Sequence, residues 1–204
     1  MTIRLWTGLV LVCAALLASA AAVAQERSTD GPTYAANRDL IRPADYREWV
    51  YVTSGLGMTY GPAGANGRPP RFDNVFVNRQ SYRSFLASGR WPDKTMFLLE
   101  IRQAEKHVSI NNGGETQGEL LRLEAAVKDT ERFPDTTWGY FSFDGPDGGL
   151  RDTAAPLPTT ASCYTCHVNN TAVENTFVQF YPTLMDVARR MGTVKPTYDP
   201  LRKP

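Results

Sequence analysis

The sequence predicts an α+β fold in which a largely antiparallel β-sheet carries a few flanking helices and a C-terminal helical segment. Two observations support this class. Five segments before residue 144 combine β-branched and aromatic residues with alternating polar and apolar positions. The connections between them are mostly short or hairpin-like, as expected for antiparallel neighbours. The predicted strands are the segments 46–54 (which also fits a helix-to-strand junction), 72–77, 94–103, 119–128 and 138–143.

The first 24 residues are treated separately from the fold. After a basic start with Arg4, residues 5–24 contain no charged side chain and end in Ala-Val-Ala, which signal peptidase can cleave. We expect a signal peptide over 1–24, cleaved near Ala24, and a single periplasmic domain over 25–204 with no stable membrane insertion after cleavage. The alternative is an uncleaved anchor, because about 20 apolar residues can span a bilayer. Residues 25–44 are predicted to be a loosely ordered lead-in.

Charge and composition limit the possible partners. The 204 residues include 22 basic and 21 acidic side chains, with no basic run, which argues against nucleic acid as a partner. Hydrophobic residues make up 42% of the chain, an ordinary value for a globular protein.

The helices are predicted from local capping signals. Asn78 is a suitable N-cap for a helix over 79–88, and Gly89 ends it. The strand that follows places Phe97 and Leu99 on one face.

Near the C-terminus, Thr171 and Glu174 form a capping-box pattern, which predicts a helix running towards Met191. Pro182 is expected to strain this helix and Gly192 to end it.

The strongest motif is Cys-Tyr-Thr-Cys-His at residues 163–167. This pattern is typical of covalent c-type haem attachment. We expect one haem c per chain, held in the C-terminal helical segment through Cys163 and Cys166, with His167 as an axial ligand of the iron. The alternatives are a zinc site that also uses His107, and a redox-active dithiol.

The sixth position on the iron is left open by the sequence. Met96 is expected in the core and His107 in an exposed turn, so an open distal site is one possibility. The candidate ligands are Met58, Met96, Met185, Met191 and His107.

Several short segments occur in a specific order with the haem motif. They are YREWV at 46–50, SY at 81–82, WPDKT at 91–95, LEAAVKD at 123–129, WGY at 138–140 and FVQFYP at 177–182. Together they resemble the cytochrome P-460 family, and most closely its cytochrome c-prime-beta type without a haem–lysine cross-link. The resemblance implies a homodimer of β-rich subunits, each with a haem that is five-coordinate at rest.

The resemblance also implies roles for individual residues. Hydroxylamine-oxidising members carry a lysine cross-linked to the porphyrin, and Leu99 stands in its place here. Leu99 and Phe97 are therefore expected to line an apolar distal site, although both also suit ordinary sheet core. Glu124 matches a glutamate placed to relay protons, and its alternative is a solvated residue paired with Arg122 or Lys128.

The expected function is a periplasmic mono-haem cytochrome that binds small gaseous ligands such as nitric oxide. The alternatives are a hydroxylamine-oxidising enzyme that passes electrons to a redox partner cytochrome, and an electron-transfer cytochrome c.

Overall fold

The computed structural model describes residues 30–59 and 69–200. The predicted signal peptide lies outside these residues, and the described residues from Gly31 onwards form one compact unit. Within the described ranges, no helix combines the length and the apolar character needed to cross a membrane.

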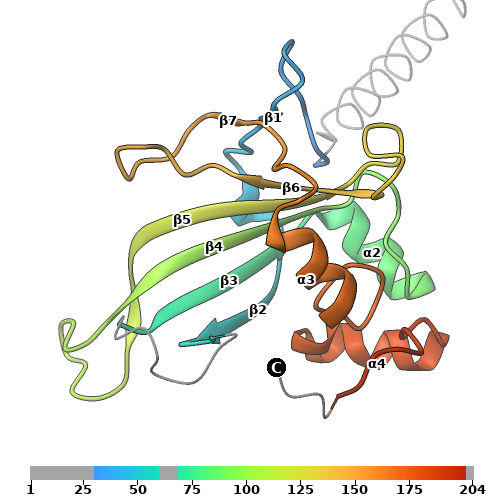
Figure 1. Cartoon of the computed structure of the whole chain (residues 1–204). Coiled ribbons are helices and arrows are strands. Elements are labelled where there is room, and N and C mark those ends of the chain that lie inside the picture. Colours follow the sequence, from blue (N-terminus) through green and yellow to red (C-terminus); the bar gives the residue numbers. More distant parts are fainter. Residues whose placement is uncertain (1–29, 60–68, 201–204) are drawn as a thin grey trace, which may run out of the picture. The chain divides into compact units, whose positions relative to one another are not determined.

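The predicted α+β fold is confirmed. A five-stranded antiparallel sheet has the order β2-β3-β4-β5-β6, and a two-stranded sheet pairs β1 with β7 (Figure 1). The strands are β1 (Leu40–Ile41), β2 (Val50–Leu56), β3 (Arg71–Val77), β4 (Met96–Glu105), β5 (Thr116–Lys128), β6 (Trp138–Ser142) and β7 (Thr153–Ala154). The helices are α2 (Arg79–Ser88), α3 (Ser162–Asn170) and α4 (Pro182–Met191), with 3-10 turns η1 (Tyr46–Glu48) and η2 (Val178–Phe180).

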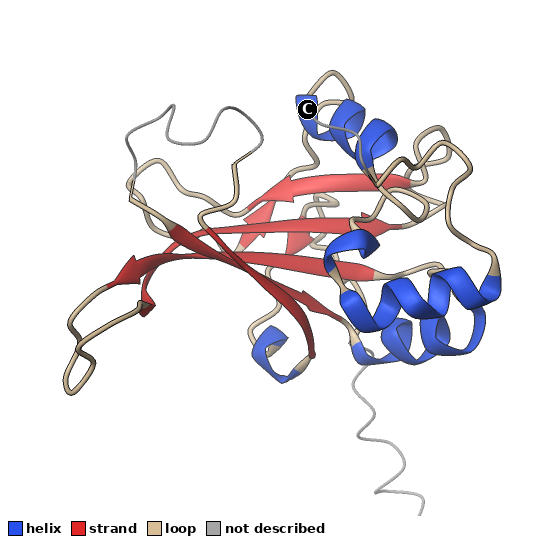
Figure 2. Cartoon of the chain, turned by 90° about the horizontal axis from the view of Figure 1, so that it is seen from below, coloured by secondary structure: helices blue, strands red, loops and turns tan. Residues whose placement is uncertain are grey.

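Helices α2, α3 and α4 pack on one face of the five-stranded sheet, which we call the helix face. They gather at the end of the sheet where β4 begins, and the other ends of the strands extend beyond them (Figures 1 and 2). The helix-face core combines Phe97, Trp138 and Tyr140 from the sheet with Phe85 and Leu184 from the helices. Their burial removes apolar surface from water and holds the helices in place.

The opposite face of the sheet, the far face, has its own core. Leu98, Leu123 and Phe141 form it together with Trp49 and Leu40. Because side chains alternate along a strand, β4 contributes to both cores at once.

The register of the sheet arranges the helix face in rows across the strands. The row beneath the helices is Val77, Phe97, Ala126 and Tyr140. The next row is Val75, Leu99, Glu124 and Ser142, and the one after it is Asp73, Ile101 and Arg122. The face therefore changes from apolar to charged along the strands, with Leu99 and Glu124 at the boundary.

Two local predictions are confirmed. Helix α2 covers 79–88 and ends at Gly89, whose φ of 69° is the left-handed conformation that glycine adopts readily. Residues 46–54 form a helix-to-strand junction, because η1 leads directly into β2.

The predicted helix from Thr171 to Met191 is wrong. The Thr171 hydroxyl lies 2.5 Å from the His167 carbonyl oxygen, so it closes the end of α3 instead of opening a new helix. Helix α4 begins only at Pro182, because a proline at the first helical position costs no backbone hydrogen bond. Gly192 ends α4, as predicted.

Residues 30–44, the described part of the predicted lead-in, are more ordered than expected. Leu40 is completely buried in the far-face core and pairs with Ala154, so β1 anchors this segment.

Candidate functional site

Helix α3 carries the Cys-x-x-Cys-His motif. Cys163 and Cys166 are three residues apart, so a helix brings them to neighbouring positions on its surface. Both thiols are free and half-buried. Tyr164 fixes the helix against β6, since its ring meets Tyr140 edge-on at 4.8 Å between centroids. The two thiols are thus presented on a helix that the core holds firmly.

The ring of His167 is oriented by a backbone carbonyl. Its Nδ1 lies 2.8 Å from the carbonyl oxygen of Asn175. A carbonyl can only accept a hydrogen bond, so Nδ1 carries the proton and Nε2 keeps its lone pair. Burial lowers the pKa of His167, which favours the neutral ring. A neutral imidazole whose second nitrogen donates to a carbonyl is the usual form of a metal-ligating histidine.

Two aromatic rings pack against this imidazole. Tyr140 lies 4.5 Å and Phe177 4.7 Å from the ring of His167, measured between centroids. They restrict rotation of the ring, so the ligand nitrogen has a defined direction.

Tyr140 also carries an orphaned polar group. Its side chain is only 4% exposed, and its hydroxyl has no hydrogen-bond partner among the residues that the structure describes. Burial raises the pKa of this phenol, and the nearby Cys163 and Cys166 raise it further. A buried hydroxyl without a partner costs about 1–3 kcal/mol. It is the kind of group that a bound cofactor with acceptor atoms satisfies, and a haem has such atoms in its carboxylates.

The residues at the motif therefore fit a haem. Two free thiols at the required spacing, an oriented neutral imidazole and an unpaired buried donor meet at one end of the helix face. Cys163 and Cys166 can hold the porphyrin and His167 can bind its iron.

Leu99 and Phe97 lie on the same face as the motif, in adjacent rows. Leu99 is half-buried, between Val75 on β3 and Glu124 on β5. Phe97 is 6% exposed and packs edge-on against Trp91, 4.8 Å between centroids. Phe97 thus belongs to the packed core, whereas Leu99 stands at its border.

Glu124 faces the helix side of the sheet, and it is also paired. Arg122 reaches its carboxylate at 2.7 Å and also bonds Asp144 at 2.6 Å. Burial raises the pKa of Glu124, and Arg122 opposes this shift. The negative charge of Glu124 adds to the burial that raises the pKa of Cys163, so the two groups lie close enough to interact. The two interpretations of Glu124 are thus compatible, because it is ion-paired and near the motif.

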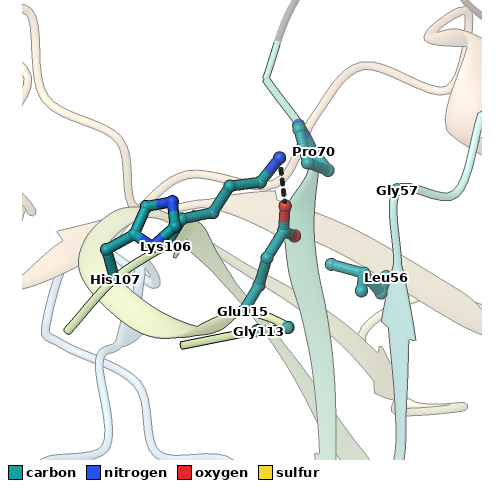
Figure 3. A pocket seen from close by; sticks show the side chains of 8 residues that line it. Leu56, Gly57, Pro70, Lys106, His107, Gly113 and Glu115 are labelled. Atoms are coloured by element: carbon teal, nitrogen blue, oxygen red, sulfur yellow. Dashed lines mark ion pairs between the residues drawn. The ribbon is translucent and has the colours of Figure 1, made fainter. Parts of the chain in front are cut away.

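The candidate sixth ligands are dispersed. Met96 is 1% exposed in the far-face core, as expected of a core residue, and Met185 is buried among the helix-face residues. His107 is exposed in the β4–β5 hairpin, as predicted. It borders a surface pocket beside the ion pair of Lys106 and Glu115, which are 3.4 Å apart (Figure 3).

Sequence reasoning missed two contributors to this site. Asn175 acts through its backbone carbonyl, which leaves no signal in the side-chain pattern. Tyr140 could have been placed on the helix face by strand alternation, but its missing partner could not be foreseen.

Comparison with known proteins agrees with this geometry. No curated protein matched the chain. The sequence profile of the family described as Cytochrome P460 matches residues 43–178, which include the five-stranded sheet and the whole of α3. The chain therefore belongs to the Cytochrome P460 family and is a haem-binding cytochrome.

Proposed function

We propose that this cytochrome is an exported c-type protein with one covalent haem and a distal site that binds small neutral gases such as nitric oxide. Cys163 and Cys166 form the thioether bonds, and His167 is the axial ligand. When bound, the haem iron supplies a coordination position that a diatomic gas can occupy.

The observation that carries the proposal is the state of His167. Its Nδ1 is committed to the Asn175 carbonyl, 2.8 Å away, while its neighbour Cys166 is a free thiol. A histidine that merely filled the core would not need to stand beside two unpaired thiols three residues apart. The Cys-x-x-Cys-His spacing on one helix, together with this oriented imidazole, supports haem attachment.

The gas-binding part of the proposal rests on Leu99. A leucine has no amine to join the porphyrin and no proton to donate, so it disfavours charged ligands and tolerates neutral diatomics. Leu99 lies between the apolar Val75 on β3 and the acidic Glu124 on β5, so it stands at the edge of the apolar part of the helix face.

Glu124 supports a second candidate, the oxidation of hydroxylamine. Its carboxylate is on the helix face, and burial raises its pKa towards the range in which it can exchange protons. The ion pair with Arg122 opposes this rise in pKa and so favours the ionised form that a proton acceptor needs.

The test is made on the mature chain expressed in a host that assembles c-type cytochromes. Its mass is measured under denaturing conditions, and ferric and ferrous absorbance spectra are recorded with and without nitric oxide. We expect one covalently attached haem, a five-coordinate resting spectrum and a clear response to nitric oxide. The Cys163→Ser/Cys166→Ser double variant is the matched control and should lose the haem when denatured.

Three other results would contradict part of the proposal or favour a different function. A colourless chain at its bare mass refutes the haem proposal. A six-coordinate resting spectrum that ignores nitric oxide refutes gas binding and favours an electron carrier. A cross-link beyond two thioethers, with turnover of hydroxylamine that is lost in Glu124→Gln, favours the enzyme.

Export to the periplasm and assembly as a homodimer belong to the same proposal. Cell fractionation with sequencing of the mature N-terminus tests cleavage near Ala24. Light scattering of the holoprotein distinguishes a dimer from a monomer.

A further inference from the structure

The carbonyl that orients His167 belongs to a tight turn. Residues 173–176, which we call the proximal turn, are closed by a hydrogen bond of 2.9 Å from the Thr176 amide to the Val173 carbonyl. Glu174 has a φ of 49°, a left-handed conformation that side chains other than glycine rarely adopt. Asn175 follows it directly. A turn with this strain keeps its shape only when other contacts hold it.

Those contacts come from Lys128 at the end of β5 and from Trp91. The Lys128 ammonium lies 2.8 Å from the Glu174 carboxylate and also donates to the Trp91 carbonyl at 2.7 Å. The second carboxylate oxygen of Glu174 accepts from the Trp91 amide at 3.3 Å. The Trp91 indole donates to the Thr176 hydroxyl at 2.8 Å. The turn is therefore held on both sides of Asn175, by Lys128 on β5 through Glu174 and by Trp91, in the loop before β4, through Thr176.

These ties are shielded from water. The Lys128 side chain is 15% exposed and that of Glu174 20%, while Trp91 and Thr176 are almost fully buried. Solvent screens an ion pair in such surroundings less than one on the surface. Burying a charged lysine at this position costs free energy unless an acidic partner such as Glu174 compensates the charge.

We propose that Lys128 and Glu174 are positioning residues that hold the Asn175 carbonyl against Nδ1 of His167 and thereby set the donor strength of the axial ligand. This inference rests on the proposed function, in which His167 binds the haem iron. A carbonyl that accepts from Nδ1 makes the imidazole more basic, and a more basic ligand stabilises the ferric over the ferrous state. The ion pair therefore lowers the reduction potential by way of the Asn175 carbonyl, since the side-chain hydrogen bonds of Lys128 and Glu174 go to each other and to Trp91.

The experiment measures the midpoint potential of purified holoproteins by spectroelectrochemistry. Lys128→Met removes the charge and keeps the length of the side chain, and Glu174→Gln keeps its shape. Both should raise the potential. Loss of the hydrogen bonds that orient a metal ligand typically lowers metal affinity or activity about 10- to 100-fold. A tenfold change in the preference for the ferric state corresponds to about 59 mV for one electron.

Two further variants exclude a general effect on folding. Lys94→Met removes another lysine, whose partner Asp129 is also buried, but Lys94 has no hydrogen bond to the proximal turn. It should leave the potential unchanged. Lys128→Arg keeps the positive charge and the hydrogen-bond donors, so its midpoint potential should lie closer to the wild-type value than that of Lys128→Met. The iron–histidine stretching frequency in resonance Raman spectra should fall in Lys128→Met and Glu174→Gln only.

The outcomes separate the two proposals. If the wild-type chain carries no covalent haem, the proposed function fails. If haem is attached but Lys128→Met and Glu174→Gln keep the wild-type potential and stretching frequency, the positioning role fails and the proposed function stands. An equal shift in Lys94→Met also overturns the positioning role. If Lys128→Met does not fold, Glu174→Gln decides.

Discussion

The buried carboxylate of Glu100 offers a test of the fold that does not depend on the haem. Glu100 neighbours Leu99 on β4 but points to the far face and is completely buried. It accepts hydrogen bonds from the Tyr46 hydroxyl at 2.5 Å, from Arg102 at 2.9 Å and from the Asn74 amide at 3.0 Å. The network joins η1, β3 and β4, and so keeps β4 in the register that presents Leu99 to the helix face.

The cost of Glu100→Gln can be worked out from these contacts. The glutamine keeps the shape of the side chain but removes its charge and replaces one acceptor oxygen by an NH2 donor. Either the Tyr46 hydroxyl, on one oxygen, or the Arg102 and Asn74 donors, on the other, therefore lose their acceptor. Removing one partner of a buried ion pair costs about 3–5 kcal/mol. A fourth contact, from Arg47 at 2.5 Å, contributes little because that side chain is 53% exposed. We expect a loss of about 3 kcal/mol, or about 6–12 °C in Tm for a domain of this size.

The assay is urea unfolding followed by tryptophan fluorescence, repeated from pH 7 to pH 3. Burial alone would raise the pKa of Glu100, but hydrogen bonds from Tyr46, Arg102 and Asn74 outweigh it and lower that pKa. The stabilisation is therefore complete above the unfolded pKa of 4.5 and is lost as the pH falls through the lower folded value. The difference between wild type and Glu100→Gln should shrink at acid pH. The exposed Glu119→Gln variant is the matched control and should change stability by less than about 0.5 kcal/mol.

A loss below about 1 kcal/mol in Glu100→Gln, or a difference that is constant from pH 7 to pH 3, would refute the account of Glu100.

Three further predictions concern the helix face and its support. Gly89→Ala should cost about 1–2 kcal/mol in chemical unfolding, because Gly89 has a φ of 69° and a new Cβ would lie 2.8 Å from that of Met191; an unchanged midpoint would contradict this. Leu99→Lys places an ammonium group opposite Glu124, so carbon-13 NMR should report a lower pKa for that carboxyl than in wild type; a pKa that stays or rises would show that the two side chains do not meet. Cys163→Ala should retain haem through one thioether, and its pyridine haemochrome band should move to longer wavelength because one vinyl group stays conjugated; loss of all covalent haem would argue against independent bonds.

Much of the sheet could be predicted because strand patterns are local. The alternation of β4, with Phe97 and Leu99 on one side and Met96 on the other, needs no knowledge of the rest of the chain. Helix α2 was equally accessible, since Gly89 supplies the left-handed residue that ends it.

The segment between α3 and α4 shows where local patterns fail. Thr171 and Glu174 have the spacing of a capping box, yet the Thr171 hydroxyl lies near the His167 carbonyl and the Glu174 carboxylate pairs with Lys128. Lys128 is 46 residues away in sequence, so no window around the motif contains it. A contact with a distant residue overrode a valid local signal.

The sequence by itself determined the chemical groups of this protein and their local order. Helical geometry alone brings Cys163 and Cys166 together, and strand alternation alone puts Leu99 and Phe97 on one face. Only the tertiary structure decided that this face meets α3, that Leu99 stands opposite Glu124, and that the Asn175 carbonyl fixes the ring of His167. The physical reason is that register and packing depend on side chains far apart in the chain, whose mutual burial and hydrogen bonding exist only once the chain has folded.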